Sequence, residues 1–131
     1  MREILFRGKR LDNGEWVYGY YVHIGPVSCQ RAYIIPEYTS AIYVKEVDPS
    51  TVDQYTGLMD KNGKRIFEGD VAKVLQGKDK DIAYVGFENG AFMLYPKTGN
   101  IYERTLWEYW YNDWDVEVIG NITDNPELLE K

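Results

Sequence analysis

Short runs of aromatic and β-branched residues, separated by polar turns, follow one another along most of this chain. Three Asn-Gly pairs stand between such runs: Asn13-Gly14, Asn62-Gly63 and Asn89-Gly90. Asn-Gly suits the positive φ angles of the tight turns that join antiparallel strands. The pattern therefore predicts a mainly β fold built from hairpins.

The first hairpin is expected between residues 4–7 and 16–22. Alternation with a period of two places four large side chains of the second strand on one face: Trp16, Tyr18, Tyr20 and Val22. We expect that face to pack inward. Two further short strands are predicted at 32–35 and 41–44. The pattern of residues changes after Asp48-Pro49, a dipeptide typical of a turn. We therefore divide a single domain (1–131) near Pro49 into an amino-terminal β-strand region (1–48) and a second part (49–131).

The second part repeats the hairpin pattern. A compact hairpin is expected between residues 54–58 and 66–67, and four more strands are predicted at 71–75, 82–87, 91–95 and 116–119. Short strands joined by polar turns are enough to close a small antiparallel barrel of the SH3-like type, which removes exposed edges. We therefore predict an SH3-like barrel in the carboxy-terminal part, with the first hairpin region as an extension.

Two stretches have a helical pattern. Within residues 104–114, three tryptophans at i, i+3 and i+7 form one stripe of a short helix or irregular turn: Trp107, Trp110 and Trp114. Near the end, Asn125 precedes Pro126 and Glu127, which is typical of a helix start with a proline at its first position. We expect one or two short helical turns.

Composition limits the class of protein. The chain has 131 residues, 44% of them hydrophobic, which is too apolar for a disordered chain, and a mean hydropathy of -0.48 with no long apolar run argues against a membrane span. The first residues reach a charge again after three apolar positions, so we read no signal peptide there. Cys29 is the only cysteine and forms no internal disulfide, which agrees with a reducing compartment. We expect a cytoplasmic protein.

The net charge of -6 is concentrated in one segment. Residues 103–131 contain eight acids and two bases, whereas residues 1–102 contain 13 of each and are neutral. Within the neutral part the bases gather in two groups: Arg2, Arg7, Lys9 and Arg10, and then Lys61, Lys64, Arg65, Lys73, Lys78 and Lys80. These are ordinary solvated residues or, as the alternative, a local basic face that binds nucleic acid.

The chain offers little for catalysis. His23 and Cys29 are its only histidine and thiol, and no phosphate-binding glycine loop, HExxH pair or paired Cys motif is present. Asp113, Asp115 and Glu117 alternate and could present three carboxylates to Mg²⁺ or Ca²⁺, but the favoured interpretation is the solvated face of the last strand. We predict no enzyme, no cofactor and no metal site.

Aromatic residues exceed what one small core needs, since 12 Tyr, 4 Trp and 4 Phe are present. Tyr and Trp are favoured in protein interfaces, where a surface is apolar yet ends in a hydrogen bond. Stacking on single-stranded nucleic acid is an alternative. Because Trp107, Trp110 and Trp114 lie in the acidic segment, they are our candidate protein interface.

Residues 52–71, VDQYTGLMDKNGKRIFEGDV, resemble the central QYTGLxDKNGKxIxEGD signature of the YopX family of phage and prophage proteins. Residues 2–8 resemble the opening strand of that family, and residues 117–129 its closing EVIGNIxxNPELL. The resemblance implies a mostly β fold with an SH3-like barrel, expression from a phage or prophage and self-association, and it implies no activity.

The signature itself reads as structural. Gly57, Gly63 and Gly69 fit positions of positive φ or close approach, Asp60 can accept hydrogen bonds from a turn, and Asp70 can brace the following strand. A polar binding site at Glu68 and Asp70 is the alternative.

Two classes of function follow. The first is a non-enzymatic accessory protein of a phage or prophage, a protein-interaction module that forms a homo-oligomer and engages a host or phage protein. The second is nucleic-acid binding through a local basic face, or mimicry of nucleic acid by the acidic segment against a host factor.

Overall fold

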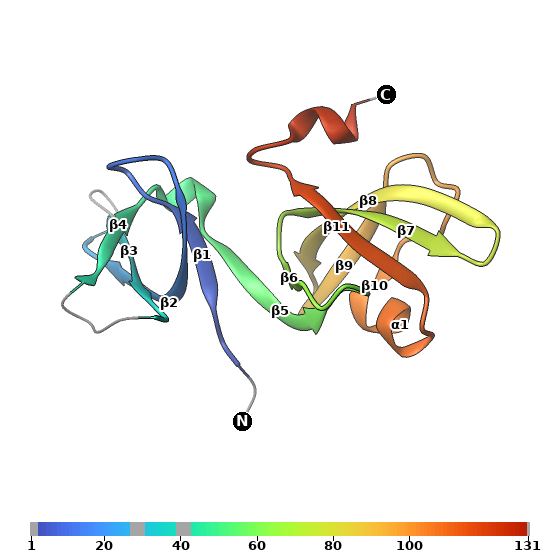
Figure 1. Cartoon of the computed structure of the whole chain (residues 1–131), viewed down its shortest axis with the longest axis horizontal. Coiled ribbons are helices and arrows are strands. Elements are labelled where there is room, and N and C mark those ends of the chain that lie inside the picture. Colours follow the sequence, from blue (N-terminus) through green and yellow to red (C-terminus); the bar gives the residue numbers. More distant parts are fainter. Residues whose placement is uncertain (1–2, 27–30, 39–42, 131) are drawn as a thin grey trace. The chain divides into compact units, whose positions relative to one another are not determined.

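The computed structural model describes residues 3–26, 31–38 and 43–130. The chain divides into two compact units, Met1–Tyr55 and Thr56–Lys131. Figure 1 follows the chain through both, coloured along the sequence. All strand pairs of the described residues for which a register is known are antiparallel, which confirms the mainly β prediction.

The first unit contains β1 (Phe6–Lys9), β2 (Trp16–Ile24), β3 (Arg31–Pro36), β4 (Lys45–Val47) and the start of β5 (Asp53–Met59). The strand order is β4-β3-β2-β1-β5, and β6 (Arg65–Phe67) follows β5 in the same hydrogen-bonded order. A short 3-10 helix, η3 (Pro49–Thr51), precedes β5, and the side chain of its cap Asp48 accepts from the Ser50 N–H at 3.0 Å. These strands match the sequence prediction closely except for β4.

The fourth strand lies later in the chain than predicted. Ala41 and Ile42 of the expected strand lie outside the described residues, and Tyr43 and Val44 are not in strand conformation. The strand is Lys45–Val47, whose Val47 pairs with Ala32 and is fully buried. The apolar run 41–44 was misleading because burial of Val47, rather than local hydrophobicity, fixes which residues pair with β3.

The predicted inward face of β2 is wrong. Tyr18 and Tyr20 are 37% and 53% exposed, and the opposite face, with Val17 at 5% exposure, packs on the core. That core comprises Val17, Ala32, Ile34 and Val47, with Phe6, Tyr21 and Val52 against it. The backbone of β3 leaves no room for a side chain at Gly19, because a Cβ on this residue would lie 1.9 Å from the Ile35 carbonyl oxygen. Tyr18 and Tyr20, which have polar hydroxyls, face solvent instead.

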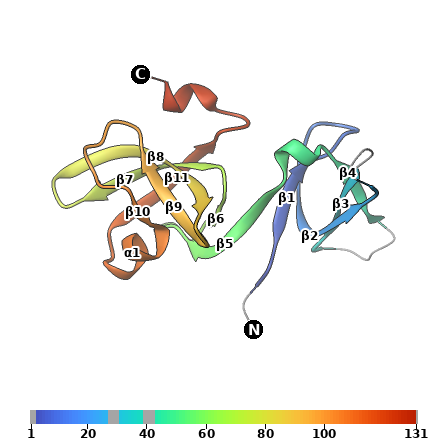
Figure 2. The ribbon, with the colours of Figure 1, turned by 180° about the vertical axis from the view of Figure 1, so that it is seen from behind.

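The second unit is built on a five-stranded sheet of order β10-β9-β8-β7-β11. Its strands are β7 (Asp70–Gln76), β8 (Asp79–Glu88), β9 (Ala91–Pro96), β10 (Arg104–Thr105) and β11 (Asp115–Asn121), and Figure 2 shows them from behind. Asn89 and Gly90 join β8 to β9 with φ of 52° and 83°, the two positive angles of a type I′ hairpin turn. The Asn-Gly prediction is confirmed at this turn.

The predicted SH3-like barrel is not confirmed, because the sheets are not closed. In the five-stranded sheet, β10 and β11 occupy the two ends of the hydrogen-bonded order. The sheet packs its inner face on a cluster of buried side chains: Ile66, Ala72, Val74, Ala83, Val85, Leu94, Ile101, Leu106, Tyr109 and Val116. Alternating strand sequences predict which residues face a core, but they contain no signal for closure.

The helical segments are short, as predicted. The helix α1 (Leu106–Tyr111) begins at Thr105, whose hydroxyl accepts from the Glu108 N–H at 3.2 Å, and η4 (Pro126–Leu129) is a 3-10 turn. Leu106 and Tyr109 form the buried stripe of α1, and Tyr109 donates its hydroxyl to the Tyr102 carbonyl at 2.7 Å. No helix among the described residues is long and apolar enough to cross a membrane.

Candidate functional site

The turn between β5 and β6 is built around Asp60. Its Oδ1 accepts from the Asn62 and Lys64 N–H groups, each at 2.9 Å, and its Oδ2 accepts from the Val118 N–H at 2.9 Å. The Lys61 N–H donates to the Val116 carbonyl at 3.0 Å. One buried carboxylate thus closes the turn and ties it to β11. Gly63 completes the turn at φ 80°, where a side chain is strained.

The remaining signature residues also lie at backbone junctions. Gly69, at φ 87°, donates to the Val85 carbonyl and accepts from the Ile122 N–H, both at 2.8 Å. Asp70 is 2% exposed and accepts from the Phe67 N–H at 2.8 Å. Glu68 is half-buried, and Gly57 has φ 89° within β5. Burial of Asp70 leaves little of the alternative polar site at Glu68 and Asp70 open to a ligand.

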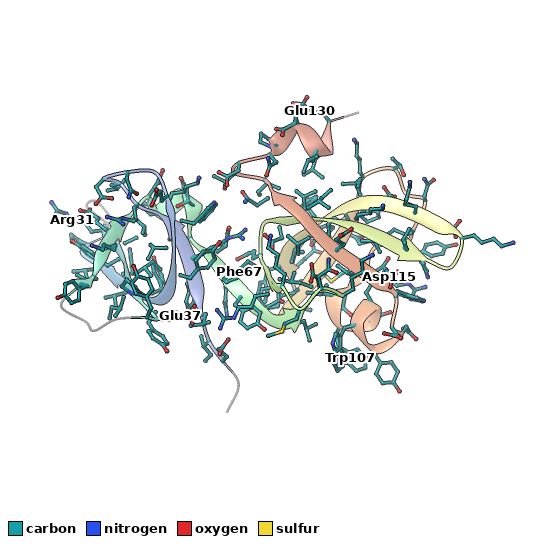
Figure 3. The ribbon with its side chains drawn as sticks, viewed as in Figure 1. Arg31, Glu37, Phe67, Trp107, Asp115 and Glu130 are labelled. Atoms are coloured by element: carbon teal, nitrogen blue, oxygen red, sulfur yellow. The ribbon has the colours of Figure 1, made fainter. Side chains whose placement is uncertain are left out.

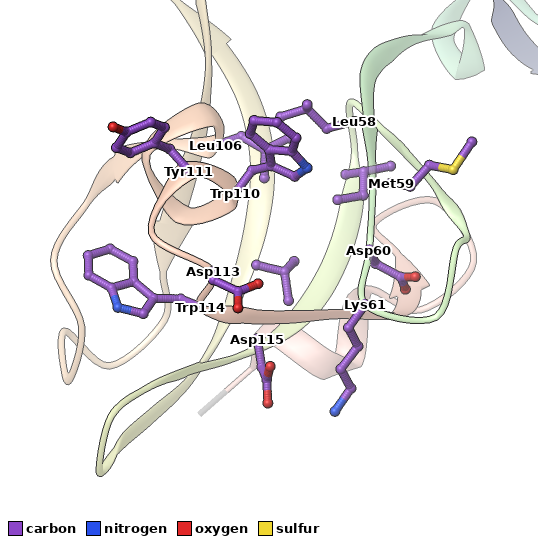
Figure 4. Close-up of a pocket in the computed structure, with 12 residues that line it drawn as sticks. Leu58, Met59, Asp60, Lys61, Leu106, Trp110, Tyr111, Asp113, Trp114 and Asp115 are labelled. Carbon is purple, nitrogen blue, oxygen red and sulfur yellow. The ribbon is translucent and has the colours of Figure 1, made fainter.

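Beside this turn the second unit has a groove of about 600 Å³. Its lining comes from three segments: Leu58, Met59, Asp60, Lys61 and Ile66 from β5 to β6, Leu106, Trp110 and Tyr111 from α1, and Asp113, Trp114, Asp115 and Val116 from the turn before β11 and its first two residues. Figure 4 shows Trp110 reaching from α1 toward Leu58, with Asp113, Asp115 and Lys61 gathered at the other end. Buried Ile66, Leu106 and Val116 make the lining apolar.

The tryptophans do not form the predicted stripe. Because α1 ends at Tyr111, Trp114 lies beyond it, and Asp113 at φ 56° turns the chain so that Trp114 packs edge-on against Tyr109 at 5.0 Å between ring centroids. Trp110 is 55% exposed and lines the groove. Trp107, labelled in Figure 3, stacks on Tyr111 at 4.9 Å and does not line the groove. The structure therefore brings two of the three candidate interface residues into one site.

The charged side chains of the groove differ in whether they are hydrogen-bonded within the turn or exposed at the rim. The Asp60 carboxylate is occupied by three backbone N–H groups. Asp113 and Asp115 are exposed at the rim, and Lys61 is the single base among the lining residues. Carboxylates therefore outnumber amines, and the rim carries a negative potential. On α1, a hydrogen bond from Arg104 at 3.0 Å holds the pKa of Glu108 below its usual value.

The three alternating acids do not gather into a cation cage. Asp113 precedes β11 with a positive φ, and Glu117 accepts from the Asn62 side chain at 3.3 Å. Across residues 3–26, 31–38 and 43–130, no group of three or more His, Cys, Asp or Glu side chains is placed to hold a metal ion. His23 is exposed beside Tyr21, and Cys29 lies outside the described residues.

A second hollow, of about 460 Å³, was missed by the sequence interpretation. It is lined by Lys73, Lys80, Asp81, Ile82, Lys97, Thr98 and Asn100. Burial of Asp81 opposes its ionisation, but hydrogen bonds from Thr98, Ile82 and Asn100 outweigh that cost and lower its pKa. Lys97 lies 17 residues beyond Lys80 in sequence, and Asp81, although it follows Lys80 directly, finds its partners at Thr98 and Asn100. Only the pairing of distant segments joins Lys97 to Lys73 and Lys80.

Comparison with known proteins places this fold. The chain matches the family model of the YopX protein over residues 5–130. The crystal structure of protein EF1440 from Enterococcus faecalis is similar, with a TM-score of 0.55 and 22% sequence identity over 99% of this chain and 100% of that one. No curated protein sequence matches. At this identity the solved structure supports the fold, while the family match covers nearly the whole chain. The protein belongs to the YopX family.

Proposed function

We propose that this protein is a non-enzymatic protein-interaction module whose binding surface is the groove between α1 and the β5–β6 turn. The observation that carries the proposal is the exposure of Trp110 and Met59, at 55% and 50%, above an apolar lining. An exposed tryptophan at an apolar hollow is typical of an interface anchor, because burying it removes a large apolar area from water.

The charge of the rim suggests the chemistry of the partner. Asp113 and Asp115 are exposed carboxylates at one end of the groove, and Lys61 offsets only one of them. A partner segment with an apolar side chain for the groove and Lys or Arg beside it meets both features. A cation placed over the face of Trp110 would add an attraction of about 0.5–1 kcal/mol at an exposed site.

The non-enzymatic part of the proposal rests on the side chains that line the groove. They offer aromatic and aliphatic surface with carboxylates and one amine, and none of them is His, Cys or Ser. The resemblance to phage and prophage proteins supports a role as an accessory protein in the cytoplasm of a bacterial host.

A displayed library of random peptides, selected on the immobilised full chain, tests this surface. We expect enrichment of peptides that combine an apolar anchor with Lys or Arg, and we expect Trp110→Ala to lose them. Tyr102→Ala is the matched control, since Tyr102 is an aromatic residue of the same unit that is 72% exposed and does not line the groove. Peptides without excess basic residues, or equal retention by Trp110→Ala, would contradict the proposal.

Self-association is a second candidate, favoured by the stacked pair Trp107 and Tyr111. These side chains are 55% and 67% exposed on α1, and two copies would remove both from water. Light scattering at roughly tens of micromolar, a range that spans common dissociation constants, measures it directly. We expect a mass above that of one chain, reduced by Trp107→Ala. A strict monomer would remove self-association while leaving the groove proposal intact.

A further inference from the structure

The outer face of the five-stranded sheet carries Lys73 and Lys97 on either side of Ile82, with Glu117 of β11 paired to Lys73 on its other side. Lys73 pairs with Ile82 across β7 and β8, and the Lys97 N–H donates to the Ile82 carbonyl at 2.7 Å, so the three residues lie side by side. Their strand neighbours Ala72, Val74 and Ala83 are fully buried in the core. Because side chains alternate along a strand, Lys73 and Ile82 project from the opposite face.

A loop held by hydrogen bonds borders these lysines. The Asp81 carboxylate accepts from the Thr98 N–H, from the Thr98 hydroxyl at 2.9 Å and from the Asn100 N–H at 3.0 Å. These bonds hold residues 98–100 against the start of β8, and they fix one wall of the hollow lined by Lys73, Lys80 and Lys97. No salt bridge to these lysines is present in the described part of the chain, and Lys97 Nζ contacts only the Leu128 carbonyl, at 3.3 Å.

Two tyrosine rings lie further along the same face of the sheet, Tyr84 beyond Ile82 on β8 and Tyr95 beside Tyr84 on β9. Tyr84 pairs with Tyr95 across β8 and β9, with ring centroids 5.1 Å apart. A Cβ on Gly86 would lie 2.5 Å from Tyr95 Cε2, so the absence of a side chain at Gly86 makes room for the Tyr95 ring. Tyr84 is 37% exposed and stands two residues along β8 from Ile82, which corresponds to about 7 Å. An open aromatic ring therefore lies one step from a basic hollow.

We propose that this lysine and tyrosine face, defined by Lys73, Lys80, Lys97, Tyr84 and Tyr95, binds single-stranded nucleic acid. Amines that follow a backbone together with an aromatic ring that stacks a base are the two elements of such surfaces. Duplex bases are already stacked and cannot use Tyr84. A free phosphate would use the lysines alone. Because lysines that contact phosphates release counterions, binding weakens as salt rises. The second unit as a whole holds 9 bases and 14 acids, a net of -5, so the attraction is confined to this face.

Fluorescence anisotropy of a labelled oligothymidylate with the full chain at low salt tests the proposal. The variant Lys73→Ala/Lys80→Ala is compared with Lys61→Ala/Lys64→Ala, which removes the same charge from the β5–β6 turn. We expect at least tenfold weaker binding for the first variant alone. The slope of log K against log salt should also fall by roughly 1.4, about 0.7 for each lost contact on a single strand.

Substitution of Tyr84 separates stacking from charge. Tyr84→Ala should weaken oligothymidylate roughly fivefold to a hundredfold, and Tyr84→Phe, which keeps the ring and the packing, should restore binding. Absence of binding to the wild-type chain at low salt would overturn the proposal. So would an equal loss in the control lysine variant, or inorganic polyphosphate and duplex DNA binding as tightly as the oligonucleotide. These results leave the peptide-binding groove untouched, because none of the five residues lines it.

Discussion

The two units use the same antiparallel hairpins but hold them together differently. In the described residues, the buried cluster of the first unit has four members and that of the second unit has ten. The second unit adds a helix and three buried aspartates, Asp60, Asp70 and Asp81, that accept hydrogen bonds from the backbone N–H groups of neighbouring turns and loops. Both proposed binding surfaces lie on this second unit. A large core and fixed loops keep exposed side chains in a constant geometry, which recognition requires.

The first unit relies on close backbone approach and on a buried ion pair. Gly19 allows the Ile35 carbonyl to approach, and a Cβ on Gly8 would meet Val47 at 3.0 Å. Arg7 Nε lies 3.0 Å from Asp53 Oδ2, and the Arg7 guanidinium lies 4.7 Å from the Trp16 ring. Interactions of this kind depend on exact placement, whereas apolar volume is more tolerant of small shifts.

The largest expected effect comes from emptying the larger core. Leu94 is fully buried in the second unit, and Leu94→Ala should lower the free energy of unfolding by about 3–4 kcal/mol. Urea unfolding followed by tryptophan fluorescence measures it, since three of the four tryptophans lie in that unit. Tyr20→Ala, at an exposed site of the first unit, is the control with little change. A loss below 1 kcal/mol at Leu94, about the value for an average substitution, would mean that the two cores do not differ as described.

Next in size is the loss of the Asp60 carboxylate. Asp60→Ala leaves three N–H groups without their acceptor, and the half-buried Val118 N–H cannot fully recover water, so we expect about 2–3 kcal/mol of destabilisation. The same urea titration applies. Asp79→Ala, an exposed acid in the same unit, serves as the matched variant and should change little. Similar midpoints for the two variants would show that the turn does not depend on this side chain.

Gly19→Ala tests the first unit. The new Cβ would collide with the Ile35 carbonyl oxygen, so β2 and β3 must separate, at a cost of about 2 kcal/mol. Gly14→Ala is the comparison: its Cβ meets open space, and only the strained φ of 71° costs about 1 kcal/mol. Hydrogen exchange of β2 amides should accelerate in the first variant more than in the second. Equal exchange rates of the β2 amides in the two variants would show that Gly19 is not needed for the close approach of β2 and β3.

The smallest expected effect is on the stability of the protein at low pH. The pKa of Asp81 is lower in the folded chain than its ordinary value of 3.8. Its ionised form therefore contributes stability that is full above that value and is lost as the pH falls through the lower, folded pKa. Asp81→Asn should remove this part of the acid sensitivity, seen as a shallower fall in melting temperature below pH 4. Asp79→Asn should leave the slope unchanged; a wild-type slope in Asp81→Asn would exclude Asp81 as its source.

The sequence predicted most strands because their turns have a local chemistry. Asn89-Gly90 specifies its hairpin within two residues, and the neighbouring runs alternate cleanly. The inward face of β2 was not predictable by size, since the buried positions of this strand are Val17 and Gly19, and at Gly19 the Ile35 backbone leaves no room for a side chain. Closure of a barrel depends on pairing between distant edges and leaves no such local trace.

The candidate sites were accessible from sequence only in part. Trp110 and Trp114 were selected correctly as neighbours, but the groove needs β5, α1 and β11 together, and no periodicity connects residues 58–61 with 106–116. Trp107 was grouped with them because positions i and i+3 of a helix share one face, but Trp107 stacks on Tyr111 and does not line the groove. Asp81 and Lys97 were missed because their neighbours come from loop contacts across β8 and β9.

The bond from Val118 to Asp60 spans 58 residues of sequence. During synthesis the residues of the β5–β6 turn therefore leave the ribosome well before Val118. Until β11 is available, the Oδ2 atom of Asp60 is hydrated. Contacts of such separation are typical of slower folding, because the intervening chain must be ordered before they form. The most distinctive segment of the sequence, the β5–β6 turn, thus completes its hydrogen bonds only after residue 118 has been synthesised.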